Sequence, residues 1–481
     1  MRYRSRRFAL KRLPVDQTPA TLPLTGPPPP TLADEFRALV RLAGPLVGAN
    51  LLHMAVFAVD VVFVARLGTT ELAAATIGVF LFNVLTWATI GLTSAAEPLI
   101  AAAIGRRVGA VRDARRSFRA GLWLGMLASV PVMAVLWNGE AIFVALGQDP
   151  VVAERAGAFL RVVAPSVPLA VAAGLIRLTA AALGRPGWAF AVTALALGVS
   201  VLANWCLVFG NLGFPPLGLE GSALAGVVVS AAMVAAYLVI LFADRRLRRY
   251  RLLGRWWRAD WQRMGVIARL GAPIGLTFTF EGGLFGGAAL LMGLIGATEV
   301  AAHAIALNVA AVVYQIPFGI AQAATIRVGM GYGARDPAWI ARAGRAALTL
   351  GIGSMAATAV LTWAAPELFV SLYLDASVAG SGAVAALAVR LLWVAAVFQL
   401  MDGAQAVAAG VLRGLQDTRT PMLVALFGYW VVGFGGAVLL AFRTELAAVG
   451  VWWGLAAGLA FVSAVLGWRW SARARLGLLP A

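Results

Sequence analysis

The chain has 481 residues, of which 61% are hydrophobic and only 12% are charged, and its mean hydropathy is +0.86. Soluble domains are about 45–50% apolar and about 25% charged, so this composition excludes a soluble globular protein, and the single cysteine excludes a disulfide scaffold. The net charge of +18 does not indicate nucleic-acid binding, because the arginines lie in short blocks between apolar runs and no segment is long enough to form a soluble basic face.

The first 37 residues differ from the rest of the chain. Six basic residues lie among the first twelve, and seven prolines follow up to Pro30. No apolar region of roughly 7–15 residues leads to a cleavage site, which argues against a signal peptide. We therefore predict a cytoplasmic tail over residues 1–37.

Twelve apolar runs follow, and each is long enough for a membrane-spanning helix, which needs roughly 20 apolar residues. The sequence thus predicts an all-α integral membrane protein with twelve transmembrane helices. Prolines inside the runs predict kinks at Pro45, Pro98, Pro165, Pro168, Pro273 and Pro317. The runs cover residues 38–65, 72–104, 118–137, 157–183, 187–210, 219–243, 266–295, 299–330, 346–370, 384–412, 420–442 and 447–468.

The arginines between the runs predict the orientation. The even-numbered connections carry 21 basic residues and the odd-numbered ones carry three, Arg66, Arg155 and Arg443. By the positive-inside rule both termini are cytoplasmic, which requires an even number of spans. We expect a multi-pass protein of the plasma membrane, the inner membrane in a bacterium.

The two halves of the sequence match at a nearly constant offset, which we call the repeat offset. The segments LAGP at 42–45 and LGTTELAA at 67–74 lie over LGAP at 270–273 and IGATEVAA at 295–302, without a gap. Six spans per copy give both copies one orientation, so the repeat is parallel. We predict an N-lobe over 38–243, an arginine-rich linker over 244–265, a C-lobe over 266–470 and a cytoplasmic tail over 471–481.

Two acids lie deep inside the predicted spans, where a charge costs roughly 2.5–3.5 kcal/mol on insertion scales. Asp402 is eleven residues from Arg413, which is roughly 16 Å of helix, and Glu281 is fifteen residues from Gly296, which is roughly 22 Å. We expect both to face a cavity, where a carboxyl group exchanges a proton or binds a cation. The alternative is a hydrogen-bonded carboxyl that holds helices together.

For two further acids, Asp60 and Glu97, an ion pair with a nearby arginine is an alternative to a functional role. Asp60 is six residues from Arg66 and can pair with it, and Glu97 can pair with the region of Arg106. None of Asp402, Glu281 and Asp60 has an acid at the matching position of the other half, so the fold of a half does not require them.

Polar and aromatic residues near these acids are expected either to pack between helices or to line a substrate cavity with cation–π capacity. They are Phe280, Phe285, Tyr314, Gln315, Phe398, Gln399 and Gln405. The chain has no phosphate loop, HExxH or GxSxG motif, which disfavours an ATP-driven pump or an enzyme. The connection GRRVGAVRDARRS does not match the pattern of major facilitator transporters.

Three stretches in register with the repeat resemble the multidrug and toxic compound extrusion (MATE) family, most of all its NorM-type branch, over about residues 38–470. They are MAVFAVDVVFVARLGTTELAAATIG, GAPIGLTFTFEGGLFGGAALLMGLIGATEVAAHAIALN and FQLMDGAQAVAAGVLRGLQDTRTPM. The resemblance implies two six-helix lobes around a central cleft. It also implies export of bulky, often cationic drugs in exchange for Na⁺ or H⁺.

The same resemblance implies roles for individual residues. Asp402 and Glu281 match the cation-site acids of the tenth and seventh spans, and Asp60 matches the acid of the first span. Ser200 and Asn204 resemble a polar pair of the fifth span, although relatives often have Asn in place of Ser200. We expect no cofactor, no metal other than Na⁺ at Glu281 and Asp402, no nucleic-acid partner, and a monomer in the bilayer.

Two other functions remain open at the level of sequence. A lipid-linked precursor flippase of related fold would favour an arginine-lined cleft, for which Arg177 and Arg390 are the only support. A non-transporting membrane sensor or scaffold is the second alternative, and the carboxylates near the midplane argue against it.

Overall fold

The computed structural model describes residues 31–374 and 381–480, and this part of the chain contains helices and no strands. Most of the predicted N-terminal tail and Asp375 lie outside the described residues. Among these described residues, eleven helices are long and apolar enough to cross a membrane, and a bent pair counted as one span makes a twelfth. The prediction of twelve transmembrane helices is therefore confirmed.

The first six spans are α1 to α9, and short helices join some of them. The bounds are α1 (Leu32–Ala65), α2 (Thr69–Ser94) with α3 (Ala96–Arg106), α4 (Ala110–Trp137), α5 (Gly139–Ala145), α6 (Pro150–Val163) with α7 (Ser166–Ala182), α8 (Gly187–Phe209), η1 (Asn211–Gly213) and α9 (Gly218–Ala243).

The last six spans repeat this order after the short helix α10 (Arg245–Arg248). The bounds are α11 (Trp261–Ile295), α12 (Ala297–Gly333), α13 (Pro337–Ala364), α14 (Pro366–Ser371), α15 (Ser381–Gly414), α16 (Arg419–Phe427) with the π-helix η2 (Gly428–Phe434) and α17 (Gly435–Arg443), and α18 (Ala447–Ser471). Helices at matching places have similar lengths: α1 and α11 have 34 and 35 residues, and α4 and α13 have 28 each.

Many helices extend beyond the apolar runs. Asp260 and Asp336 cap α11 and α13 with side-chain acceptors for backbone N–H groups, so these helices begin five and nine residues before their runs. Arg116, Arg327 and Arg413, which we expected in connections, therefore lie on helix ends. Arginine is a good helix former, so a helix can continue past its apolar segment.

Two of the prolines predicted to cause kinks lie at or next to a break between two helices. Pro165 lies at the break between α6 and α7, where the chain turns by 52°, and Pro98 follows the break between α2 and α3. Pro45, Pro273 and Pro317 lie inside helices that continue past them, and Pro168 lies in the first turn of α7, so the kinks predicted at these four residues stay predictions.

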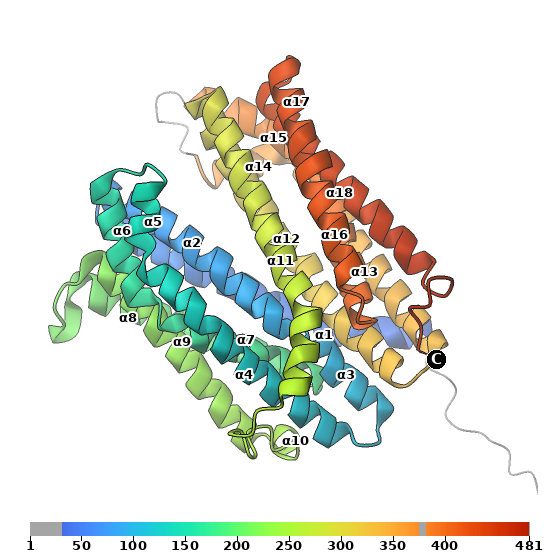
Figure 1. Cartoon of the computed structure of the whole chain (residues 1–481). Coiled ribbons are helices and arrows are strands. Elements are labelled where there is room, and N and C mark those ends of the chain that lie inside the picture. The colour runs from blue at the N-terminus through green and yellow to red at the C-terminus, as the bar shows by residue number, and fades with distance from the viewer. Residues whose placement is uncertain (1–30, 375–380, 481) are drawn as a thin grey trace, which may run out of the picture.

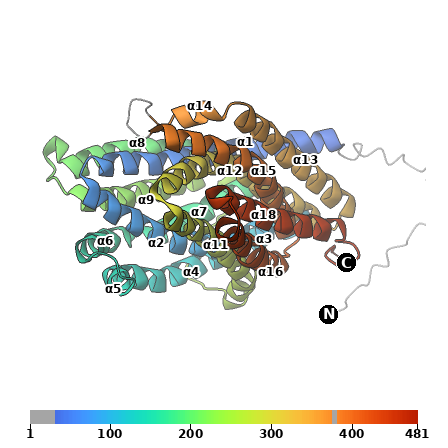
Figure 2. The same cartoon turned by 90° about the horizontal axis from the view of Figure 1, so that it is seen from above.

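The two sets of six helices pack together at one end, which we call the arginine-rich end. It is the end at which α1 begins and α3 and α12 stop, and it faces the lower side of Figure 1. Toward the top the sets diverge, so that α5 and α6 lie apart from α14 and α17 in Figures 1 and 2. We call the top the opposite end. A separate hydrophobic core there belongs to the first six spans alone.

Glycines bring the two sets into backbone contact near the arginine-rich end. Gly105 on α3 lies against the Met330 carbonyl on α12, and Gly333 lies against the Ala102 carbonyl. Gly333 matches Gly105 and Met330 matches Ala102 at the repeat offset, so the contacts are reciprocal. Reciprocal contacts of this kind are expected about a two-fold axis, and a side chain at either glycine would push the helices apart.

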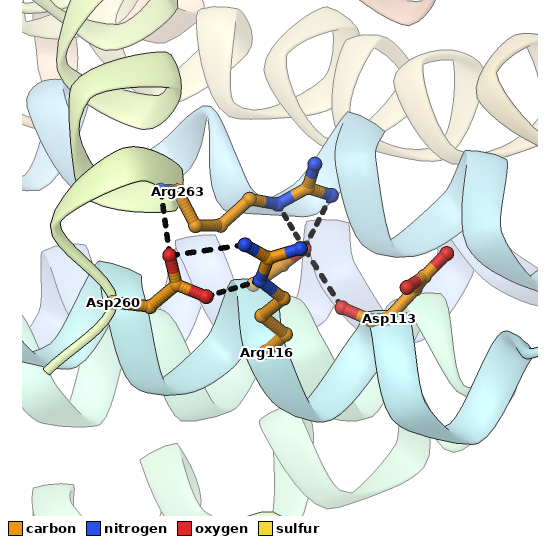
Figure 3. A network of polar contacts seen from close by, with 5 residues as sticks. Asp113, Arg116, Asp260 and Arg263 are labelled. Carbon is orange, nitrogen blue, oxygen red and sulfur yellow. Dashed lines mark hydrogen bonds and ion pairs between the residues drawn. The ribbon is translucent and has the colours of Figure 1, made fainter. Parts of the chain in front are cut away.

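A polar clasp joins α4 to the start of α11 at the same end (Figure 3). Arg116 forms an ion pair with Asp260, and the Arg263 guanidinium donates to Ser117 Oγ at 2.7 Å. The clasp connects the first six spans to the last six through side chains, in addition to the covalent linker.

Candidate functional site

The two acids predicted in the last six spans come together. Asp402 lies on α15 and is 5% exposed, and its Oδ1 atom has no hydrogen-bond partner among the described residues. Glu281 lies on α11, close enough to interact electrostatically with Asp402. Two carboxyl groups that interact in this way form one site, because the charge state of each group changes the energy of ionising the other.

Tyrosines from two other helices complete the surroundings of the acids. Tyr314 on α12 lies close enough to the Glu281 carboxyl to interact with it. Tyr429, within the π-helix, interacts with both acids and donates to Gln405 Oε1 at 2.7 Å. A hydroxyl group donates to a carboxylate or offers its own oxygen to a cation, so this set accommodates either a proton or a monovalent ion.

The donor set does not resemble a transition-metal centre. Within residues 31–374 and 381–480, no three or more His, Cys, Asp or Glu side chains gather as ligands. Two carboxylates with hydroxyl and amide oxygens are hard ligands, which suit Na⁺ rather than zinc or copper.

A second polar site lies in the first six spans. The Asp60 carboxylate on α1 accepts from Asn204 Nδ2 at 2.7 Å and from Ser200 Oγ at 3.2 Å, both on α8. The structure therefore brings together the three residues that we singled out there, and Ser200 replaces the more common asparagine as a donor. The alternative that Asp60 pairs with Arg66 is not observed, because the ion pairs of the described residues do not include it.

Arg413 is a site residue that the sequence analysis missed. It lies in the last turn of α15, where it interacts with Glu97 of α3 and with Tyr314 and Glu281. Glu97 is 3% exposed and its Oε1 atom has no hydrogen-bond partner among the described residues, so the predicted pair with Arg106 is not formed. The signal was available: eleven residues are about three turns, so Asp402 and Arg413 share one helix face.

The two arginines that supported a flippase lie apart from any shared cleft. Arg177 donates to Asn50 Oδ1 at 2.8 Å, an interhelical contact, and Arg390 is exposed on α15. Most of the other arginines gather at the arginine-rich end.

The predicted cavity residues divide into two groups. Phe398 and Gln399 are each 1% exposed, and Phe398 packs between Phe285 and Trp452 with ring centroids at 6.2 and 5.3 Å. The Gln405 side chain accepts a hydrogen bond from the Tyr429 hydroxyl. Phe280, Tyr314 and Gln315 remain half-buried.

An aromatic cluster lies between the two sets of helices, and two of its members, Trp87 and Phe318, were not predicted. Trp87 on α2 meets Phe278 and Phe318, on α11 and α12, at centroid distances of 6.2 and 6.5 Å. Tyr314 stacks on Phe318 at 5.8 Å. The cluster thus extends from the first six spans to Tyr314, the tyrosine that interacts with Glu281. Half-buried aromatic faces next to acids suit a lipophilic cation.

The chain matches known proteins along most of its length. The MatE family model matches twice, over residues 45–206 and 273–439, so the starts of the two matches are separated by the repeat offset. A "Probable multidrug resistance protein NorM" of Mesorhizobium japonicum is 45% identical and covers 92% of this chain and 95% of its own length. A protein of the same name from Brucella suis is 42% identical over 91% and 93% of the two chains.

A solved structure has the same fold. It is entitled "Outward-facing conformation of a multidrug resistance MATE family transporter of the MOP superfamily", and it superimposes with a TM-score of 0.82 at 19% identity. The alignment covers 93% of this chain and 97% of that one. The arrangement of two six-helix sets is thus a known architecture.

Proposed function

Because the chain belongs to the MatE family of membrane transporters, and so is not an enzyme, we propose that it is a multidrug efflux antiporter. Its substrates are bulky organic compounds, mostly cationic, which leave the cell in exchange for Na⁺ or H⁺. The names of the relatives support this proposal. The observation that carries it is the pair formed by the buried Asp402 and the half-buried Glu281, which has an unsatisfied oxygen on Asp402 and adjoins an aromatic cluster between the two sets of helices.

The proposed mechanism is alternating access of two lobes, residues 38–243 and 266–470. In this structure the arginine-rich ends are packed together and the opposite ends diverge. With the arginine-rich end in the cytoplasm of a bacterial cell, this arrangement opens toward the outside. The drug is released outside, and the ion binds at Asp402 and Glu281. The transporter then returns to the inward-open state. Coupling requires that the drug and the ion prefer different conformations, one the inward-open and the other the outward-open state.

We place the coupling site at Asp402 and Glu281 of the C-lobe rather than at Asp60 of the N-lobe. Asp60 has two hydrogen-bond donors, whereas Asp402 keeps an oxygen free for an incoming proton or ion. Arg413 links the coupling site to Glu97 of the other lobe, so a change of charge at Glu281 alters an attraction that spans the two lobes. No nucleic acid or cofactor takes part, and one monomer suffices.

The test is transport by everted membrane vesicles that contain the full-length chain. Accumulation of a fluorescent lipophilic cation is measured with a pH gradient alone, with a Na⁺ gradient alone, and with neither. We expect one gradient to drive accumulation at least severalfold above vesicles without the protein. Absence of transport with either gradient, together with movement of anionic or lipid-linked compounds, would replace this proposal with the flippase.

A further inference from the structure

A pocket of about 720 Å³ opens at the arginine-rich end, away from the acids and aromatics described above. It lies where α3 and α12 end and α1 and α13 begin, so both sets of six helices contribute to it. Its lining includes five arginines and two acids: Arg106, Arg107, Arg327, Arg335, Arg342, Glu35 and Asp336.

The acids do not neutralise the pocket. Glu35 is occupied by Arg327, at 2.7 Å. Asp336 serves as the N-cap of α13 and accepts from the backbone N–H of Trp339 at 2.9 Å. Three arginines, Arg107, Arg335 and Arg342, have no ion pair among the described residues.

Two donors on the wall of the pocket have no acceptor. Arg342 Nε and Trp339 Nε1 are buried and make no hydrogen bond within the described part of the chain. A buried N–H group without a partner is unfavourable, so these two side chains gain a hydrogen bond when they shift toward an acceptor that binds in the pocket. Arg327 lies over the Trp339 ring, 5.2 Å from its centroid.

Two of the unpaired arginines come from matching places in the two halves. Arg107 and Arg335 are separated by the repeat offset and follow the reciprocal glycine contacts, and both have left-handed backbone with φ of 62° and 54°. One arginine therefore approaches the seam from each half. The N-terminal segment adds six basic residues and a single acid, Asp16, so its composition supplies no counter-charge.

We propose that this pocket binds a phosphate-bearing anion, the headgroup of an acidic phospholipid or free phosphate, between the two halves. Arginine guanidinium groups bind phosphate oxygens through paired hydrogen bonds, and basic pockets between transmembrane helices suit acidic headgroups. Because both halves contribute arginines, the bound anion stabilises the arrangement in which the arginine-rich ends are closed. This site is independent of the coupling acids and of the drug.

The first experiment measures the Tm of the purified full-length protein in a neutral detergent while sodium phosphate replaces sodium chloride at constant ionic strength. We expect a saturable rise of at least about 2 °C, because a ligand that binds only the folded state stabilises it. A parallel measurement compares nanodiscs of phosphatidylcholine with nanodiscs that also contain cardiolipin, in buffer without phosphate. A rise with phosphate alone identifies the free anion as the ligand, and a rise with cardiolipin identifies the headgroup.

Three variants make the test specific. The double variant Arg335→Gln/Arg342→Gln should lose most of the rise, and the single variant Arg107→Gln, at an exposed position that does not endanger folding, should weaken the apparent affinity severalfold. Arg249→Gln removes an exposed arginine outside the pocket and should keep the wild-type response. Equal rises in all variants, or no saturable rise with either probe, would overturn the proposal.

A distance measurement tests the link between the halves. Spin labels at Val108 and Ala338, in a Cys206→Ser background, report the separation of the two exposed sites on either side of the pocket. Phosphate or cardiolipin should increase the population with the short distance, and the double variant should not respond. An unchanged distribution upon saturation would refute stabilisation of the closed end.

Discussion

Two buried carboxyl groups keep an oxygen atom without a hydrogen-bond partner in the described structure, Asp402 Oδ1 and Glu97 Oε1. Arg413 interacts with Glu97, and it also interacts with Glu281, the partner of Asp402. A protein that needed these acids only to hold helices together would supply local donors to their buried oxygens, as it does for Asp60 Oδ1. The unsatisfied atoms therefore favour a role in which the occupancy of the site changes.

The substitution Asp402→Asn should prevent the site from gaining or losing a proton or cation at this position, while it preserves the size of the side chain. We expect normal amounts of protein in the membrane and at least a roughly tenfold loss of gradient-driven efflux, which corresponds to about 1.4 kcal/mol. If Asp402 only joined helices the effect would be small, since such hydrogen bonds average about 0.6 kcal/mol. The measurement is dye accumulation in vesicles at matched expression, with the exposed Glu220→Gln as control. Full activity of Asp402→Asn would remove the residue from the mechanism.

Double variants distinguish one coupling site from two. Glu281→Gln combined with Asp402→Asn should transport no worse than the poorer single variant, because both acids belong to one site. Asp60→Asn combined with Asp402→Asn should show the product of the two single effects, because Asp60 contacts Ser200 and Asn204 in the other half. Transport rates of the single and double variants in the same vesicle assay provide the comparison. Non-additivity between Asp60 and Asp402 would contradict separate sites.

The sequence predicted the individual acids of the site but not the residues that surround them. An acid in an apolar run is conspicuous whatever surrounds it, so Asp402, Glu281 and Asp60 were predicted. Arg413 was assigned to a connection because it ends an apolar run, and Trp87 and Phe318 have no charge that distinguishes them from packing residues. Their significance depends on which helices meet, and the pattern along one helix does not contain this information.

At the scale of elements, the clasp between α4 and α11 is a polar contact that responds to pH. The side-chain hydrogen bond from Arg116 holds the pKa of Asp260 below its ordinary value, and the backbone N–H of Arg263 acts in the same direction against burial. A carboxylate with a lowered pKa contributes its full stabilisation above its ordinary pKa of about 3.9. The contribution is lost as the pH falls through the lower folded-state pKa.

Asp260→Asn should therefore lower the Tm at pH 7 and have no effect in strong acid, where the wild-type carboxyl is also protonated. Asparagine keeps the N-cap of α11, so the loss is that of the ion pair, and we expect roughly 1–3 °C for a partly exposed pair. Thermal unfolding of the purified protein across this pH range measures it. Asp149→Asn, which changes an N-cap of α6 that lacks an ion pair among the described residues, serves as control. A pH-independent difference would show that the cap, not the charge, matters.

The spans were predictable because a membrane imposes a minimum length on each apolar run. The ends of the helices were less predictable than the spans. Helix α13 begins nine residues before its apolar run, because the Asp336 cap and helix-forming arginines extend it. The π-helix over Gly428–Phe434 was not predicted. It widens one turn to insert residues without ending the helix, and hydropathy does not distinguish such a turn from α-helix.

At the scale of the whole molecule, the orientation in the membrane remains a prediction. Cysteines replacing the exposed Arg251 and Glu445, in a Cys206→Ser background, should react with an impermeant thiol reagent from opposite sides of intact cells and everted vesicles. Arg251 belongs to the arginine-rich end and should label only in everted vesicles, by the positive-inside rule. Labelling of both cysteines from one side would contradict twelve spans with cytoplasmic termini.

The reciprocal glycine contacts also bear on the history of the chain. Gly91 approaches Gly275 and Gly319 approaches Val47, and these two contacts are again related by the repeat offset, as are those of Gly105 and Gly333. A surface that meets its own copy in this way is what a symmetric homodimer requires. A six-helix ancestor with an even number of spans would insert both subunits in one orientation, so gene fusion needed only a linker at the arginine-rich end. Separate expression of the two halves, cut within residues 249–258, should accordingly yield fragments that reassemble.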